Sequence, residues 1–273
     1  MFYSAATESG SIESPNEDWV AMSPTVVIVL DGVTVHKEFQ GSCSHGTPWY
    51  VRHLGTKLLV EASDHEISLR DALRTAISAT ASLHADVCQL DQIGAPSAAV
   101  AVLRMNEHDI EYLVLADITI LIKSNKRLAV ISDERVSSTV EDLAGKADNF
   151  AEVMNRRSRY RNKEHGHWVA AAAPDAADYA LIGRVSNDGF DSAAIMSDGA
   201  SRLVIPFQQT NWHGLLAQTQ QAGPAAVIKA VREVEVGDVE RKRWPRFKVS
   251  DDATVAFLAA EPCARANAEE KDI

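Results

Sequence analysis

Acidic residues stand at the ends of apolar, strand-like runs along the whole sequence. In chain order they are Glu17, Asp18, Asp31, Asp117, Asp198, Asp251 and Asp252. A carboxylate at the end of a strand emerges at the rim of its sheet, where several can meet although they are far apart in the chain. Converging carboxylates repel one another unless cations lie between them. Oxygen ligands of this kind suit hard ions such as Mg²⁺ or Mn²⁺.

Each acidic residue taken alone has a simpler interpretation as a turn residue. Asp31 and Asp198 are each followed by glycine, and Asp251 is followed by a second aspartate. Asp-Gly and Asp-Asp pairs are common in turns because the short side chain bonds its own backbone. Only the ordered set of acidic residues, taken together, therefore indicates a metal site.

Apolar runs predict the strands that position these residues. The run Thr25–Leu30 is continuous and β-branched, which is typical of a strand buried on both faces. The other predicted strands are Asp18–Met22, Ser97–Met105, Ile110–Ala116, Ile118–Ser124, Arg127–Ser132, Ala193–Met196 and Ala253–Ala259. Short polar turns separate the four runs between residues 97 and 132, which favours an antiparallel meander.

Helical spacing of apolar residues predicts the remaining elements. Ser68, with Asp71 three residues later, has the pattern of a helix N-cap. The predicted helices are within Pro48–Ala62, over Ser68–Leu90, Ser138–Tyr160, Trp212–Gln221 and Pro224–Val234. Because strands follow strands and helices follow helices along the chain, we expect an α+β fold with helices packed outside the sheets.

Composition limits the function classes. The 273 residues carry 27 Lys and Arg against 38 Asp and Glu, a net charge of −11. This balance argues against a nucleic-acid partner, which needs a basic face. Residues 1–18 lack the pattern of a signal peptide, and no apolar run is long enough to cross a bilayer. We therefore expect no membrane partner and a cytoplasmic location.

The cysteines indicate the redox compartment, and the lack of linkers indicates the number of domains. Cys43, Cys88 and Cys263 are widely spaced and form neither a disulfide framework nor a zinc pattern in the sequence. A reduced compartment is the simpler interpretation. Because no linker divides the chain, we expect a single domain over residues 1–262 and a disordered tail over 263–273.

Five short motifs, in order, resemble the metal-dependent protein phosphatases (protein phosphatase type 2C, PPM), especially the bacterial stand-alone type. The motifs are NED at Asn16–Asp18, VLDG at Val29–Gly32, LADITILI at Leu115–Ile122, MSDGASRLV at Met196–Val204 and SDDATVAFL at Ser250–Leu258. The segment Arg161–Leu181 also resembles one found in bacterial members. The resemblance implies an α-β-β-α sandwich of two antiparallel sheets flanked by helices.

The resemblance also implies a site for two Mg²⁺ or Mn²⁺ ions. Asp31 would bridge both ions, and Asp198 and Asp251 would hold the first. Glu17 and the carbonyl of Gly32 would serve the second, mostly through waters. A hydroxide formed between the ions would attack phosphorus in line. Zn²⁺ is not expected here, because no His or Cys ligands accompany these carboxylates.

Three departures from the family pattern concern substrate and a further ion. Glu13 stands where members carry a phosphate-binding Arg, and Val33 where many carry a His that serves as the acid. Asp117 matches one ligand of a third metal, but Arg202 stands at the position of the other. Arg202 is therefore our first candidate for binding substrate phosphate.

Other residues remain open for the missing roles, and none is assigned as the leaving-group acid. Arg161 is the second candidate for phosphate binding, ahead of the others. The remaining candidates are Arg157 and Arg159 for phosphate and His36, His45, His165 and His167 for the acid, all with simpler surface roles. Cys43 near His45 suggests a nucleophile, but no supporting acid is close in sequence.

These inferences predict a metal-dependent phosphomonoester hydrolase, most simply a protein serine/threonine phosphatase. Its partner would be a phosphorylated protein. Loss of the family Arg keeps a small phosphorylated metabolite open as the substrate. A pseudophosphatase that binds a partner without turnover is the third hypothesis, although the mapped metal ligands are intact.

Overall fold

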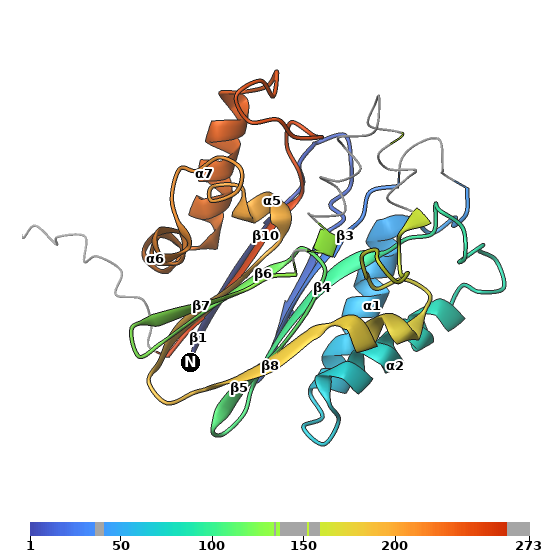
Figure 1. Ribbon diagram of the computed structural model, residues 1–273, viewed down its shortest axis with the longest axis horizontal. Coiled ribbons are helices and arrows are strands. Elements are labelled where there is room, and N and C mark those ends of the chain that lie inside the picture. Colours follow the sequence, from blue (N-terminus) through green and yellow to red (C-terminus); the bar gives the residue numbers. More distant parts are fainter. Residues whose placement is uncertain (36–40, 134, 137–151, 153–158, 261–273) are drawn as a thin grey trace, which may run out of the picture.

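Two five-stranded antiparallel sheets form the centre of the molecule (Figure 1). The computed structural model describes residues 1–35, 41–133, 135–136, 152 and 159–260. Sheet A has the order β1 (Phe2–Glu8), β10 (Ala253–Ala259), β9 (Phe190–Met196), β6 (Thr119–Ser124) and β7 (Arg127–Ile131). Sheet B has the order β2 (Trp19–Met22), β3 (Val26–Gly32), β4 (Ala98–Met105), β5 (Asp109–Leu115) and β8 (Leu181–Ser186).

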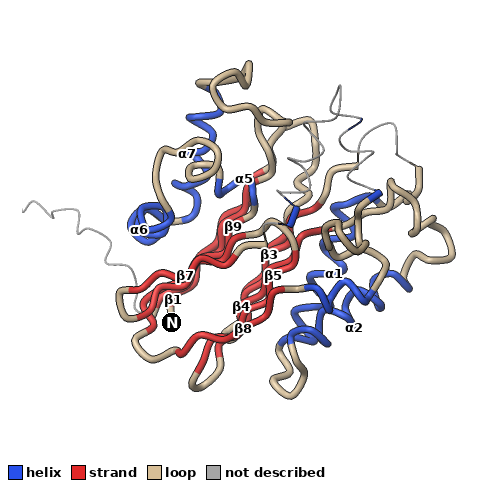
Figure 2. Tube along the Cα trace, viewed as in Figure 1, coloured by secondary structure: helices blue, strands red, loops and turns tan. Residues whose placement is uncertain are grey.

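Helices cover the outer face of each sheet, so that the molecule has four layers (Figure 2). On sheet B lie α1 (Gly46–Ala62) and α2 (Leu69–Ser82), and the short helix η2 (Pro174–Tyr179) packs against α2. On sheet A lie the short α5 (Asp198–Ser201), α6 (Trp212–Ala222) and α7 (Pro224–Val236). The predicted α-β-β-α sandwich is confirmed.

Strand β3 shows why the central run of the sequence is apolar without alternation. Val26, Ile28 and Leu30 pack under α1 and α2, whereas Val27 and Val29 pack between the sheets. Successive side chains of a strand point to opposite faces. Both faces of β3 are covered, so every residue from Val26 to Leu30 is buried.

The predicted meander between residues 97 and 132 is wrong in its pairing, although its strands are present. The hairpin β4–β5 belongs to sheet B and the hairpin β6–β7 to sheet A. The chain crosses between the sheets at Ala116, whose φ of 73° is left-handed. Because the backbone turns there, β5 pairs next with β8 and β6 with β9. Asp117 lies directly at this crossing.

Helix α2 begins as predicted but ends earlier. The hydroxyl of Ser68 accepts a hydrogen bond from the amide of Asp71 at 3.1 Å, which confirms the N-cap. The helix ends at Ser82 rather than Leu90, and Leu83 and Val87 are exposed. The apolar residues beyond Ser82 follow helical spacing but have no neighbouring layer to pack against, whereas His84 turns inward and is 2% exposed.

Most of the other predicted elements are present, and two observed strands were not expected. The strands in β2, β3, β9 and β10 and the helices α1, α6 and α7 are confirmed, whereas β1 and β8 were not predicted. Most of the helix predicted over residues 138–160, and the tail over 263–273, lie outside the described residues. Among the described residues, no helix has both the length and the apolar character needed to span a membrane.

Candidate metal centre

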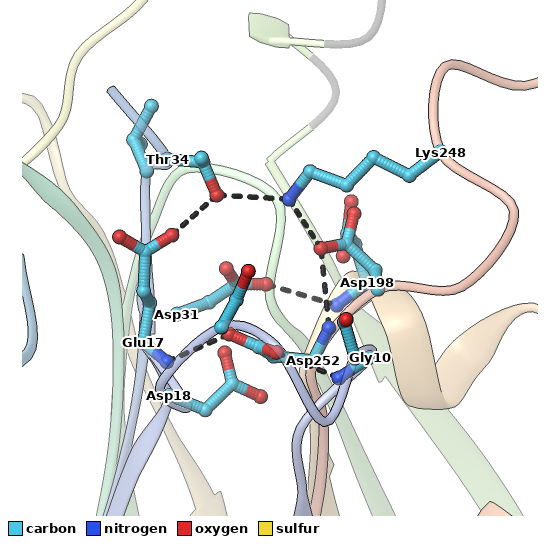
Figure 3. A network of polar contacts seen from close by, with 12 residues as sticks. Gly10, Glu17, Asp18, Asp31, Thr34, Asp198, Lys248 and Asp252 are labelled. Atoms are coloured by element: carbon cyan, nitrogen blue, oxygen red, sulfur yellow. Dashed lines mark hydrogen bonds and ion pairs between the residues drawn. The ribbon is translucent and has the colours of Figure 1, made fainter. Parts of the chain in front are cut away.

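The carboxylates of the ordered set come from both sheets and meet at one end of the sandwich, where strands of both sheets end (Figure 3). Asp31 is the second-to-last residue of β3 in sheet B, and Glu17 immediately precedes Asp18 and β2 in the same sheet. Asp198 begins α5 after β9 of sheet A. The backbone amide of Asp198 donates to Oδ2 of Asp31 at 3.3 Å. This bond joins the two halves of the site across the sandwich.

Two glycines allow the backbones to approach closely at this point. A Cβ added at Gly32 would overlap the carbonyl oxygen of Glu17 and the methyl of Thr47. A Cβ added at Gly199 would overlap the carbonyl oxygen of Asp252. The glycine that follows Asp31 and the one that follows Asp198 are therefore needed for packing, beyond any role in a turn.

Asp18 is the member of the set with the least satisfied side chain. It is 7% exposed, and neither carboxylate oxygen has a hydrogen-bond partner among the described residues. Burial raises the pKa of Asp18 to about 8, and the nearby charges of Asp252 and Asp198 add to the rise. A buried carboxylate without a partner is costly unless a proton or a cation neutralises it. The sequence placed Asp18 in a motif but gave it no role.

The pKa values of Asp31 and Asp198 are raised, as is that of Asp18. Burial raises the pKa of Asp31 well above its usual value, and repulsion from Asp18, Asp198, Asp117 and Asp251 raises it further. Burial, Asp251 and Asp117 raise the pKa of Asp198 to about 6. Asp117 is thus close enough to Asp31 and Asp198 for its charge to raise the pKa of both.

Asp251 differs from the other carboxylates because two cations hold it. Nζ of Lys248 donates to Oδ1 of Asp251 at 2.6 Å, and Nη2 of Arg202 donates to Oδ2 at 3.1 Å. Arg202 is 7% exposed, and its Nη1 also pairs with the buried Glu235 at 2.6 Å. Arg202 is therefore held between two carboxylates, one of them in the site.

Lys248 reaches across the mouth of the carboxylate group (Figure 3). Its ammonium also donates to the hydroxyl of Thr34 at 2.9 Å, and Thr34 donates in turn to Glu17. Burial opposes the charge of Lys248, but the carboxylates of Asp251, Asp198 and Asp31 outweigh it, and its pKa is raised. Sequence patterns did not indicate this residue, since an isolated lysine on a basic loop carries no motif.

Neighbouring Asp251 and Asp252 have different partners. The side chain of Asp252 accepts from the amide of Gly10 at 2.8 Å and from the amide of Glu17 at 2.7 Å. It therefore fixes the N-terminal loop, and through that loop the position of Glu17. Asp251, in contrast, bonds the side chains of Lys248 and Arg202.

This donor set fits hard divalent cations. It consists of carboxylates and a backbone carbonyl, with no imidazole or thiolate in the motifs. The unpartnered oxygens of Asp18 and the raised pKa values of Asp31 and Asp198 report negative charge that is not compensated. A divalent cation would supply that compensation.

The other residues considered for phosphate binding or as the acid have different surroundings. Arg161 donates to the carbonyls of Gln92 and Ala95, both at 2.9 Å, so its guanidinium fixes the segment before β4. Glu13, Arg159 and His165 are exposed, whereas His167 is buried. His36 and Arg157 lie outside the described residues.

The overall fold has clear relatives among solved structures. A serine/threonine phosphatase PstP/Ppp of Mycobacterium tuberculosis superposes with a TM-score of 0.60 at 16% identity, over 95% of this chain and 98% of that one. Stp1 of Staphylococcus aureus gives 0.59 at 11% identity, over 95% and 94%. The chain has the fold of the PPM-type serine/threonine phosphatases.

One of these PPM-type structures contains metal. The catalytic domain of PstP in complex with two manganese ions superposes with a TM-score of 0.58 at 15% identity, over 94% of this chain and 96% of that one. No family model matches the sequence, and no curated protein matches it significantly. The likeness to the PPM phosphatases is therefore carried by the structure and by short motifs rather than by overall identity.

Proposed function

We propose that this protein is a metal-dependent phosphomonoester hydrolase that acts on phosphoserine or phosphothreonine in proteins. The main support is the meeting of carboxylates from both sheets at one end of a PPM fold, where desolvation and mutual repulsion raise the pKa values of Asp31 and Asp198. The carboxylates lie at the ends of strands, where backbone hydrogen bonds hold them in place.

Two Mg²⁺ or Mn²⁺ ions are the proposed cofactors. Asp31, Asp198 and Asp251 would hold one ion, and Asp31, Glu17 and the carbonyl of Gly32 the other. When bound, the pair would supply an activated water and positive charge to offset that of the phosphoryl oxygens. Asp18 would add negative charge close to Asp31, and Asp117 is available to a third ion.

Lys248 is the proposed partner of the substrate phosphate. Glu13 replaces the family Arg and is exposed, and Arg202 is already held by Glu235 and Asp251. The side chain of Lys248 is 38% exposed, and its ammonium lies over the carboxylates. Once an ion neutralises Asp251, this ammonium would be free to turn toward a phosphate entering from the solvent side.

The test compares hydrolysis of phosphopeptides and of p-nitrophenyl phosphate with and without Mn²⁺. Lys248→Met should lower kcat/KM about tenfold to a hundredfold, the scale of a lost charged hydrogen bond of about 1.5–3 kcal/mol. Lys229→Met is the matched control, because Lys229 is exposed on α7 and pairs only weakly with Glu233. Turnover that does not depend on a divalent metal would contradict the proposal.

A binding role without turnover is the second candidate, and one observation favours it. Lys248 and Arg202 together satisfy both oxygens of Asp251, as a metal ion would. If Lys248 takes the place of an ion, the wild-type chain hydrolyses no phosphoester with Mn²⁺, and Lys248→Met binds Mn²⁺ more tightly. Preference for small phosphoesters over phosphopeptides would instead indicate a metabolite phosphatase.

A further inference from the structure

Four side chains with soft and nitrogen donors meet away from the carboxylates. They are Cys43 and His45, just before α1, and His84 and Cys88, just after α2. One sulfur or nitrogen atom from each residue lies within 4.8 Å of those from the other three. The two pairs are about forty residues apart in the chain, and the fold brings them together.

Four of the six separations between these atoms match a tetrahedral metal site. The Sγ atoms of Cys43 and Cys88 are 3.3 Å apart. Sγ of Cys43 lies 3.7 Å from Nδ1 of His45 and 3.4 Å from Nδ1 of His84, and Sγ of Cys88 lies 3.4 Å from Nδ1 of His45. A tetrahedral zinc ion with Zn–S of about 2.3 Å and Zn–N of about 2.0–2.1 Å separates its ligands by about 3.3–3.8 Å.

Both imidazoles are held in the orientation that ligation needs. Trp49 in the first turn of α1 packs against the ring of His45, with centroids 4.4 Å apart, and against that of His84 at 4.9 Å. His45 occupies the N-cap position of α1 but makes no side-chain cap bond, since its Nδ1 faces the cysteines. Gly46, with φ of 76°, makes the turn between this ligand and the helix.

We propose that Cys43, His45, His84 and Cys88 form a structural zinc site. All four positions of a tetrahedron are filled by protein ligands, which is the pattern of structural rather than catalytic zinc. Binding converts two thiols to thiolates and releases their two protons to solvent, and the two thiolates balance the charge of Zn²⁺. The step requires no oxidant.

The site would fix the start of α1 next to the carboxylate centre. The amide of Gln89 donates to the carbonyl of Ser42 at 2.7 Å, so a backbone hydrogen bond already connects the two ligand-bearing segments. Two residues after His45, the hydroxyl of Thr47 donates to the carbonyl of Val33 at 3.2 Å, beside Gly32. Zinc would thus clamp the ends of α1 and α2 beneath the segment that follows Asp31.

A disulfide between Cys43 and Cys88 is the competing arrangement. A disulfide would bring the two sulfurs to about 2.05 Å, and it would leave both imidazoles without a reason to turn Nδ1 toward them. The observed 3.3 Å separation and the convergence of two rings favour the metal.

The first experiment measures metal content by elemental mass spectrometry on the full chain purified without chelators. We expect one zinc per chain in the wild type and none in the double variant Cys43→Ser/Cys88→Ser or in His84→Asn. Cys263→Ser and His108→Asn are the matched controls and should retain zinc; the side chain of His108 is 87% exposed. A wild type without zinc and with Cys43 joined to Cys88 by a disulfide would overturn the proposal, as would unchanged zinc in the double variant.

A second measurement keeps the proposal testable if these variants fail to fold. The wild type is stripped of zinc under reducing conditions, checked by circular dichroism, and titrated with Co²⁺. One equivalent should produce the visible and thiolate charge-transfer bands of tetrahedral cobalt, and Zn²⁺ should abolish them. Carboxylates cannot give thiolate bands, so this signal is independent of the catalytic proposal. A folded protein that shows no such bands would refute the site.

Discussion

The carboxylate centre and the Cys–His cluster are built in opposite ways. The first gathers oxygen donors from separate strand ends in two sheets, far apart in sequence. The second gathers sulfur and nitrogen donors from two short segments at the ends of neighbouring helices. An open oxygen site suits ions that exchange and meet substrate, whereas a closed site of thiolates and imidazoles suits an ion that stays. If both proposals hold, donor type alone would separate the catalytic metal from the structural metal in this fold.

Chelation should give the largest effect, and the carboxylate centre should lose its ions before the Cys–His cluster loses zinc. A brief treatment with EDTA removes ions from the oxygen ligands and abolishes phosphatase activity, while zinc held by thiolates remains. Activity returns with Mn²⁺ or Mg²⁺ but not with additional Zn²⁺. Activity and elemental zinc are measured in parallel samples over the treatment. Simultaneous loss of both would show that the two regions do not differ as proposed.

Asp31→Asn should lower kcat by about a thousandfold or more. It removes a charged ligand from a site whose ions provide several kcal/mol of transition-state stabilisation, at 1.36 kcal/mol for each factor of ten. Asp198→Ala should behave similarly. Because the Cys–His cluster is independent, both variants should keep one zinc per chain. Near-normal kcat in Asp31→Asn would place the chemistry elsewhere.

Rising pH should act in opposite directions on the two regions. The carboxylate centre should lower the free energy of unfolding of the metal-free protein, whereas the Cys–His cluster should bind zinc more tightly. Burial raises the pKa of Asp18 to about 8 and that of Asp198 to about 6, so the native metal-free protein binds more protons than the unfolded chain between about pH 4 and 8. The free energy of unfolding without Mn²⁺ therefore falls as pH rises through this range. Zinc binding strengthens over the same range, because its thiols and imidazoles must lose protons.

Urea unfolding of Mn²⁺-free protein at several pH values checks this prediction. Asp18→Asn is the matched variant, since it keeps the shape of the side chain and removes the titrating group. Its stability should fall less with pH than that of the wild type. An equal slope in both proteins would mean that Asp18 does not carry the effect.

Ala116→Gly should give the smallest effect, a stabilisation of about 0.5–1 kcal/mol. Ala116 has a φ of 73°, where a Cβ is strained and glycine is not. The residue leads into Asp117 at the crossing between the sheets, so the variant also tests whether that strain matters to the carboxylate centre. Thermal unfolding measures the stability, and Mn²⁺-dependent kcat measures the site. A lower melting temperature would contradict the interpretation of strain.

Local patterns in the sequence were enough to predict most elements and the order of the acidic motifs. The β-branched run of β3 and the capped start of α2 are decided by neighbouring residues, and both were predicted. The pairing of the four strands between residues 97 and 132 was not, because it depends on the backbone angle of Ala116 and on partners some seventy residues away.

The contacts made by single side chains were harder to anticipate. Arg202 was expected near phosphate because of its spacing from Asp198, but its charge is shared with Glu235, which only the packing of α7 reveals. Lys248 has no motif around it. The Cys–His cluster had a usable signal, since Cys43-x-His45 and His84-x3-Cys88 each have ligand spacing, but a count of cysteines alone did not detect it.

The pairing of β1 with β10 also determines when the carboxylate centre can be completed during synthesis of the chain. Phe2 lies opposite Ala259, so the first strand finds its only neighbour in the sheet at the end of the described chain. Sheet B, with Glu17 and Asp31, is complete once residue 186 has emerged, whereas Asp251 and β10 come last. If the carboxylates bind metal as we propose, a nascent chain would hold only the sheet B half of the centre, and an incomplete product of translation would lack Asp251 and with it the proposed activity.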